Sequence, residues 1–568
     1  MDMDRLLDGK LELQDIWNAY QDAIDFNADK QTVNVSEENN NMYVGRQWEG
    51  IEIEEEELAD LPIITLNFIR PVVQIKVANI MSTKTKIVAQ PVGLAGVPTK
   101  QQEFIADIVN KQLEKICERE DFDNKVLELM TNTAVDGDGC WYGYWDEDIE
   151  TGQSKPGDFS FENIRNVNVF FGNPLCNEVQ RQPFTIVERR EYTSNLKSYA
   201  KKIGLKDGDI SAIQPDTDNQ YTINNDDNRV TVLTFFWRDF KTNTIKMNEC
   251  TQNVMLQENV DTGLKNYPVC WQNWEPVLNS YHGEACVTEM VSNQIAINRL
   301  ATMQAISLSR TAFPTVVYNE ELLPGGWDNS VGAAIPIKLF DVKATDVATT
   351  ISPANHASEL DRMVDWLLNS SKDLNGANDA MLGNIKPENT SAIIAVQKSA
   401  TVPLELNKLR LYKFLQDFAR MAIDFMANYY GERQVLAVSP ESGEEEVMPF
   451  DFSQLQHVAF NIKIDVGASS YWSEITESQT LDNLFDRQII TPDIYLKYLP
   501  NGLLAYKQEI IAELKQLRQA EQFATQQDAL MTMLEKSPET AQRLQQLKGH
   551  DPEAYEQMVQ QLFQNIQG

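Results

Sequence analysis

Residues 282–313 read HGEACVTEMVSNQIAINRLATMQAISLSRTAF, a run compatible with one long helix. A strand-like insert punctuated by proline and glycine follows at 314–355. A second helix is expected at Ala357–Asn375, then a polar loop with two glycines at 376–389. A third and very long helix is expected at Thr390–Tyr430. This order of elements is the most informative feature of the chain.

The expected helix at Thr390–Tyr430 is unusually long. Helices in globular proteins average about three or four turns, whereas about forty residues with a rise of about 1.5 Å each extend about 60 Å. Pro403 lies inside this run, and a proline there removes a backbone hydrogen bond and predicts a kink. An element of that length suits a wall or a strut, so the pattern favours a structural channel subunit over an enzyme.

The composition is that of a large acidic protein. At 568 residues the chain is expected to hold several domains or subdomains. Its formal net charge is −35, and the first 60 residues hold 17 acidic and four basic side chains, including the run Glu54–Glu57. Such a run predicts a solvated face. Because a conventional DNA-binding protein carries a basic surface, any role with DNA must avoid tight binding.

The six cysteines include no CxxC pair, a pattern typical of reduced intracellular thiols. The first ten residues, MDMDRLLDGK, lack the basic and apolar regions of a signal peptide. No apolar run reaches the length of about 18 residues that a membrane-spanning helix needs. We therefore expect a protein that is made and folded in a cytoplasm.

Further elements are expected on both sides of this region from apolar periodicity. The expected helices are 1–30, one from about Pro71, 104–116, 122–135, 472–486, 491–499 and 502–519. The expected strands are 86–92, 140–145, 168–171, 230–238, 315–318, 335–340, 435–438 and 460–466. Residues 31–60 are too polar to suggest a helix or strand, and the composition of residues 204–228 predicts an exposed loop. The Gln-rich tail predicts helices as well, so the chain is of the α+β class.

Motifs of common enzymes and metal sites are weak or missing. The sequence contains no P-loop, zinc-protease or dinucleotide signature. Asp136-Gly-Asp138-Gly139 resembles the start of a calcium loop, but Trp141 occupies the sixth position, where such a loop needs glycine. A helix-to-strand turn is the favoured interpretation.

Cys270, His282 and Cys286 form the one candidate zinc group. His282 and Cys286 would share a helix face if the helix begins that early. Because no fourth ligand is evident and unpaired cysteines are often buried, buried cysteines are the favoured interpretation. No catalytic residue, metal or cofactor is predicted. A metal-dependent nuclease, which would use clustered carboxylates, remains as an alternative function.

Several stretches resemble the portal proteins of tailed bacteriophages, in particular those of short-tailed phages. Tyr43-Val-Gly45-Arg-Gln47-Trp48 resembles a G-x-Q-W element of the early wing region. Asn67-Phe-Ile-Arg70-Pro71-Val-Val is similar to the N-x-I-x-P-[IV]-V stretch of the family. The strongest likeness lies in the order of helix, insert, helix, loop and long helix, and it extends over about residues 40–500.

The resemblance implies a ring of about twelve identical subunits around a DNA channel at one capsid vertex of the virion. The implied parts are a wing at 1–281 with return strands at 431–472, stem helices at 282–311 and 356–375, a clip at 312–355, a tunnel loop at 376–389, a tunnel helix at 390–430 and a helical crown at 473–568. Implied partners are the double-stranded viral DNA, the terminase large subunit, a head-completion or adaptor protein, and the major capsid and scaffolding proteins. A tail adaptor, another ring-forming virion protein, is the structural alternative.

The resemblance also implies roles for individual residues. Asn378, Met381, Asn384 and Lys386 would line the DNA channel in the tunnel loop, with Lys386 offering one ring of positive charge in an otherwise acidic channel. Trp327 and Tyr318 would contact partner proteins from the clip, and the alternative for Trp327 is that it closes the clip of a neighbouring subunit. Pro403 would mark the kink of the tunnel helix. A ring of about twelve subunits does not match a duplex with about 10.5 base pairs per turn, so no single register locks all contacts at once. This mismatch favours sliding of the DNA.

Overall fold

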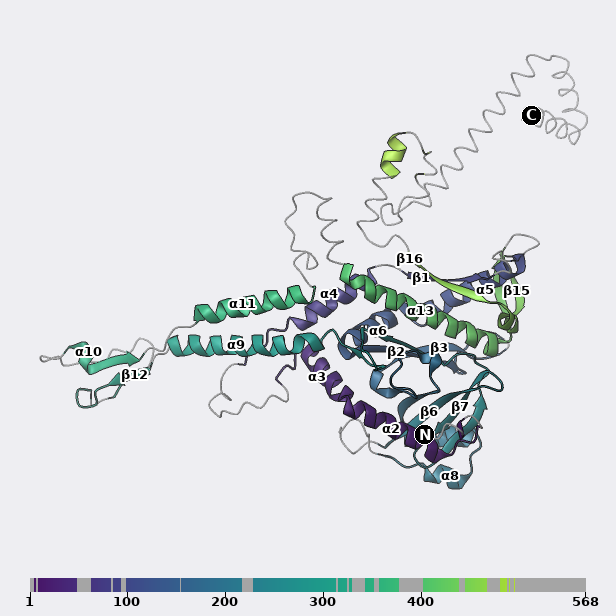
Figure 1. Ribbon diagram of the computed structural model, residues 1–568, viewed down its shortest axis with the longest axis horizontal. Helices are drawn as coiled ribbons and strands as arrows, with labels where there is room; N and C mark the ends of the chain where they lie inside the picture. Colours follow the sequence, from purple (N-terminus) through teal and green to yellow (C-terminus); the bar gives the residue numbers. More distant parts are fainter. Residues whose placement is uncertain are drawn as a thin grey trace, which may run out of the picture. The chain divides into compact units, whose positions relative to one another are not determined.

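The structure is a computed structural model that describes most of the chain up to residue 466. The described residues are 5–6, 9–48, 63–82, 85–92, 99–153, 155–216, 228–312, 315–323, 326–328, 343–351, 357–376, 402–438, 445–466, 481–487, 490 and 495. The chain divides into two units, Met1–Gly467 and Ala468–Gly568. The first unit combines helices with several small antiparallel sheets (Figure 1), which confirms the α+β class.

A three-stranded antiparallel sheet, in the order β3-β2-β9, lies at the centre of the first unit. Its strands are β2 Asp138–Asp146, β3 Asp158–Ile164 and β9 Val269–Asn273. Trp141 on β2 is fully buried, and its ring centroid lies 4.6 Å from that of Phe161 on β3. The rings of Phe414 and Phe418, on helix α13 (Glu405–Phe425), lie 5.0 Å from it. Aromatic pairs at such distances add to area burial, so they hold α13 on the sheet.

A five-stranded antiparallel meander forms the second sheet. Its strands are, in order, β4 Val169–Phe171, β5 Phe184–Tyr192, β6 Arg229–Asp239, β7 Thr244–Cys250 and β8 Met255–Asp261. Helix α2 (Leu13–Asp29) buries Ile16 and Tyr20 against this sheet. Helices α7 (Thr193–Lys202) and α8 (Asp207–Ala212) cover a separate cluster of its apolar residues. Part of the expected exposed loop 204–228 is therefore helical, and 217–227 lies outside the described residues.

Helix α3 (Thr32–Val44) lies in a region where the sequence suggested no structure. It begins after Gln31, whose φ of 54° is left-handed, and ends at Gly45. Its contacts are largely polar: Ser36 donates to Asp136 Oδ1 at 2.6 Å, and Asn39 donates to Thr288 Oγ1 at 2.9 Å. A helix held by hydrogen bonds shows no apolar stripe, which is why its pattern was missed.

Most of the other expected elements are confirmed with small shifts of their ends. Helices α4 (Ile69–Met81), α5 (Lys100–Arg119) and α6 (Phe122–Asp136) match the expected ones. Strands β1 (Thr85–Pro91) and β16 (Phe460–Val466) pair with each other along their full length. Strands β14 (Glu432–Val438) and β15 (Glu445–Asp451) form a ribbon, of which only β14 was expected.

The turn between α6 and β2 confirms the helix-to-strand interpretation of residues 136–139. Gly137 has a φ of +92°, and a Cβ atom built on it would lie 2.6 Å from the carbonyl oxygen of Gly283. The Asp138 carboxylate accepts hydrogen bonds from the backbone N–H of Gly283 and from Asn273 Nδ2, both at 2.7 Å. The Asp138 carboxylate is therefore engaged in the hydrogen bonds that hold the turn.

Helices α9 (Thr288–Ala312) and α11 (Ala357–Leu374) lie side by side and run in opposite directions (Figure 1). The insert between them contains α10 (Ala344–Val347) and the antiparallel pair β12 (Thr315–Tyr318) and β13 (Ala348–Ile351). Strand β13 was not expected, and the expected strand 335–340 lies outside the described residues.

Two helix ends in this region differ from expectation. Helix α9 begins at Thr288, six residues after the expected start, because residues 283–284 pair as strand β11 with β10 (Glu275–Pro276). Helix α13 begins at Glu405, directly after a single 3-10 turn at Val402–Leu404, and continues into a π-helical turn that ends at Tyr430. Residues 390–401 of the expected long helix lie outside the described residues.

An extended segment, 63–68, is held on α9 by a row of polar side chains. Thr302 Oγ1 accepts from Ile64 N at 3.2 Å, and Asn298 Oδ1 accepts from Leu66 N at 2.9 Å. Gln294 Oε1 accepts from the Phe68 N–H, and Gln294 Nε2 donates to the Leu66 carbonyl at 2.8 Å. These three side chains recur every four residues, so they share one face of the helix.

In the second unit the structure describes residues 481–487, 490 and 495. Residues 481–486 are helical, which agrees with the end of the helix expected at 472–486. Tyr495 donates its hydroxyl to Asp482 Oδ1 at 2.6 Å, and its ring centroid lies 4.9 Å from that of Phe485. Residue 495, inside the helix expected at 491–499, is helical, and the rest of the helices expected after residue 490 lies outside the described residues.

Replacing Gly137 with alanine is expected to lower the melting temperature of the protein. The left-handed backbone alone costs about 1–3 kcal/mol for a residue with a side chain, and the new methyl group would collide with the Gly283 carbonyl. Gly204→Ala is the matched control, since Gly204 has a φ of +84° with open space around it. Equal losses of melting temperature in the two variants would contradict this role of Gly137.

Replacing Asn298 with alanine is expected to destabilise the protein by about 1–3 kcal/mol, because the part-buried Leu66 N–H and the buried Gln47 Oε1 lose their partner. Asn293→Ala, at a half-buried position of the same helix, serves as the control. Proteolysis under native conditions should also cut 63–68 faster in the Asn298 variant. Unchanged cutting there would show that the row of polar side chains does not hold the segment.

Candidate functional site at the base of the α9–α11 helix pair

The helix pair α9–α11 presents large apolar side chains to solvent. On α11, Val364 and Ser371 face inward, whereas Met363, Trp366 and Leu374 are exposed. The last three have spacings of three and eight residues, so they lie near one face of the helix. This face gives α11 apolar residues on two sides, which one packed neighbour does not explain.

Exposed apolar side chains also occur on α9 and at the start of α13. Met303 and Leu308 are exposed on α9, and Val402, Leu406 and Leu409 are exposed where α13 begins. Together with those on α11 they range from 45% exposed at Met363 to 82% at Leu374. Exposed apolar side chains that gather on neighbouring elements are typical of surfaces that contact other proteins. We call these eight residues the apolar surface.

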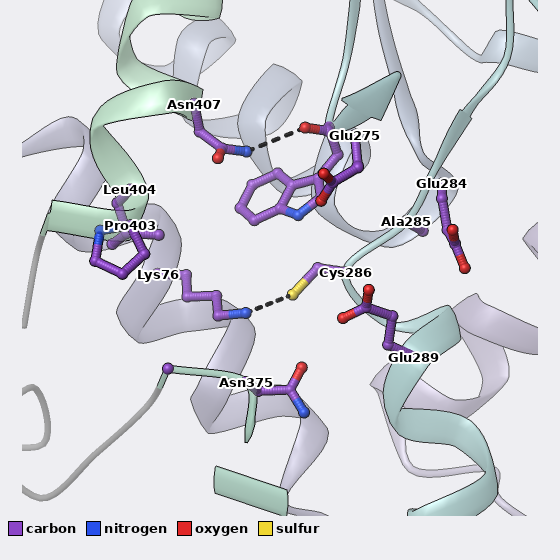
Figure 2. A pocket seen from close by; sticks show the side chains of 12 residues that line it. Lys76, Glu275, Glu284, Ala285, Cys286, Glu289, Asn375, Pro403, Leu404 and Asn407 are labelled. Atoms are coloured by element: carbon purple, nitrogen blue, oxygen red, sulfur yellow. Dashed lines mark hydrogen bonds between the residues drawn. The ribbon is translucent and has the colours of Figure 1, made fainter. Parts of the chain in front are cut away.

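A cavity of about 150 Å³ lies where α4, α11, the approach to α9 and the start of α13 meet. Figure 2 shows its lining: Lys76, Trp274, Glu275, Glu284, Ala285, Cys286, Glu289, Asn375, Gly376, Pro403, Leu404 and Asn407. Asn375 directly follows α11 and Pro403 precedes α13, so the cavity brings together the two described ends that flank residues 377–401.

Lys76 and Cys286 face each other inside this cavity (Figure 2). Lys76 Nζ donates to Cys286 Sγ at 3.2 Å, and the two residues are 9% and 3% exposed. Burial raises the pKa of the Cys286 thiol, and the neighbouring lysine opposes that shift. A buried lysine is rare without a charged partner, and Glu275, Glu284 and Glu289 surround the same cavity.

The start of α13 is tied to the cavity wall by backbone contacts. The carbonyl oxygen of Trp274 accepts a hydrogen bond from Asn407 Nδ2 at 3.3 Å and another from the Arg410 guanidinium. Pro403 has no backbone N–H to donate, and it sits in the 3-10 turn just before the helix. Its expected role as the kink of a longer helix stays a prediction.

The three residues of the candidate zinc group do not form a metal-binding group in the structure. His282 and Cys286 both precede α9, so the condition under which they would share a helix face is not met. His282 Nδ1 lies 2.7 Å from Asp138 Oδ2, and its Nε2 lies 3.1 Å from Asn27 Oδ1. Cys270 is buried on β9, and burial raises its pKa. No metal-binding group of three such side chains was found among the described residues.

The other expected site residues fall partly within the described ranges. Tyr318, at the end of β12, is 39% exposed. Trp327 is half-buried in the insert. Asn378, Met381, Asn384 and Lys386 lie outside the described residues.

Sequence reasoning missed Lys76, although a signal for it exists. The buried positions of α4 are Ile69, Val72, Val73, Lys76, Val77 and Ile80. Lys76 is thus a lone lysine on an otherwise apolar helix face. The apolar surface was missed for a different reason, because periodicity does not tell an apolar face that packs inward from one that is exposed.

Comparison with known proteins agrees with the resemblance of the sequence. Residues 17–249 match the family model of phage P22-like portal proteins, P22 being a short-tailed phage. No curated protein matches the chain significantly. None of the described helices is long and apolar enough to cross a bilayer. The matched residues, from α2 to β7, form a P22-like portal protein domain, and proteins of that family are non-enzymatic components of the virion involved in genome packaging.

Proposed function

We propose that this portal protein assembles into a ring of about twelve subunits at one capsid vertex, around a channel for double-stranded viral DNA. The apolar surface is the observation that carries this proposal, because it leaves eight large apolar side chains exposed on an isolated chain. Burying one such side chain contributes about 1.5–3 kcal/mol. In a closed ring every subunit contacts a neighbour on each of its two sides, so the apolar surface of every copy is covered.

The parts of the ring follow the order of elements. We assign 1–281 and 431–472 to the wing, 282–311 and 356–375 to the stem, 312–355 to the clip, 376–389 to the tunnel loop, 390–430 to the tunnel helix and 473–568 to the crown. The side-by-side packing of α9 and α11 supports the stem assignment, with the stem helix proper beginning at Thr288. The strand pair β12–β13 supports the clip assignment.

The clip is the proposed docking site for the terminase large subunit and later for a head-completion or adaptor protein. It joins the ends of the two stem helices, and Tyr318 and Trp327 are its aromatic candidates for such contacts. Scaffolding and major capsid proteins would contact the outside of the ring. These partner assignments rest on the likeness to portal proteins.

The charge of the chain fits a channel that lets DNA slide. Each copy carries a formal net charge of −35, and DNA is itself a dense anion. Acidic walls repel the phosphate backbone, so the duplex does not adhere during translocation. In this proposal Asn378, Met381, Asn384 and Lys386 face the duplex, and the ring of Lys386 side chains centres it.

Replacing Leu374 with serine is expected to weaken ring assembly. The loss of one buried leucine at each interface should raise the protein concentration for half-assembly about tenfold or more. Leu278→Ser is the matched control, since Leu278 is 88% exposed and lies outside the apolar surface, while Leu374 is 82% exposed. Sedimentation velocity measures the ring fraction. Equal assembly of both variants would contradict the role of the apolar surface.

Replacing Lys386 with glutamate is expected to lower the yield of DNA-filled particles severalfold and to leave ring assembly unchanged, because the change puts a ring of negative charge around the duplex. Lys202→Glu makes the same charge change at an exposed position of α7. Particles are separated on a density gradient and their DNA is measured. A normal yield from the Lys386 variant would exclude the centring role.

A further inference from the structure

The cavity at the base of the helix pair contains a lysine–cysteine pair that the proposed ring and channel do not use. Lys76 and Cys286 come from positions 210 residues apart in the chain, and their Nζ and Sγ atoms lie 3.2 Å apart. Lys76 lies on α4, and Cys286 lies just before the start of α9. A hydrophobic residue at position 76 would continue the apolar face of α4 without the cost of a buried amine.

We propose that Lys76 and Cys286 form a covalent nitrogen–oxygen–sulfur bridge when the protein is exposed to a peroxide. The separation of 3.2 Å leaves room for one bridging oxygen with little movement of either side chain. The cavity of about 150 Å³ is large enough to admit a peroxide, since a space of about 15 Å³ already holds a water. The bridge would fix α4 to the start of α9 within one chain, so its formation does not depend on ring assembly.

The chemistry balances with two equivalents of peroxide. One peroxide oxidises the thiol to a sulfenic acid, forming an S–O bond, breaking the peroxide O–O bond and releasing one water. A second peroxide oxidises the neutral lysine amine to a hydroxylamine and releases another water. The hydroxylamine oxygen then attacks the sulfenic sulfur, whose hydroxyl leaves as a third water. Sulfur and nitrogen each lose two electrons, and the ammonium proton passes beforehand to water or to a cavity carboxylate.

The surroundings of the pair set the expected rate. The thiolate is the form that reacts with peroxide, and burial keeps Cys286 mainly as the thiol. The bridge should therefore form slowly, over hours, and not in seconds. A virion component leaves the reducing interior of a cell for oxidising surroundings, where such slow chemistry has time to occur.

The test is peptide mass spectrometry of the full-length protein after hydrogen peroxide treatment. Remaining thiols are blocked and the protein is digested with trypsin, which cannot cleave after a bridged Lys76. The expected product joins the Lys76 and Cys286 peptides with a mass about 14 Da above their sum, because one oxygen is added and two hydrogens are lost. Dithiothreitol should release it. Recovery of Cys286 as sulfinic acid or free thiol, with Lys76 unlinked, would overturn the proposal.

Two controls keep the result specific. Cys270 is also buried but has the Asp417 carboxylate as a charged neighbour, so its peptide should not become linked to a lysine. Peroxide should raise the melting temperature of the wild-type protein by a few degrees, because the bridge closes a loop of about 210 residues. The same treatment should leave the Cys286→Ser and Lys76→Arg variants unshifted. An equal rise in those variants would show that another reaction is responsible.

Discussion

The packing of Trp141 against α13 is the contact on which the arrangement of the first unit depends. Trp141 belongs to the portal domain that the family model covers, whereas Phe414 and Phe418 belong to a helix more than 150 residues beyond its end. Burial of aromatic side chains of this size contributes about 1.5–3 kcal/mol each. Because the aromatic cluster holds α13 on the central sheet, it also sets the position of the first turn of that helix. Its start then forms one wall of the cavity beneath α9 and α11.

The base of the helix pair is built mainly from polar contacts, in contrast to that aromatic core. Gln294, Asn298 and Thr302 hold the segment before α4, while Asn407 and Arg410 hold the Trp274 carbonyl. Buried polar contacts specify direction, because hydrogen bonds tolerate less misalignment than apolar packing. Such a base suits helices whose apolar side chains face outward, where we propose that a neighbouring subunit packs. In that proposal, local stability comes from the polar contacts and assembly from the apolar surface.

Elements with a strong apolar period or a turn glycine could be predicted from the sequence. Helices α5, α6 and α11 and the turn at Gly137 are of this kind. Helix α3 could not, because Ser36 and Asn39 hold it by hydrogen bonds, and the start of α9 was placed too early because pairing of β10 with β11 overrides helix propensity locally. The closeness of Lys76 and Cys286 depends on tertiary packing, which no spacing in the sequence encodes. The exposure of Trp366 and Leu374 likewise appears only once α9 and α11 are seen together.

The central proposal is that this chain, which contains a P22-like portal protein domain, acts as a closed ring around DNA. Native mass spectrometry of the purified full-length protein, combined with negative-stain imaging of the same sample, tests it most directly. The account predicts a particle of about twelve chains with a central channel. A compact dimer at every salt and protein concentration, with no ring in the images, would contradict it.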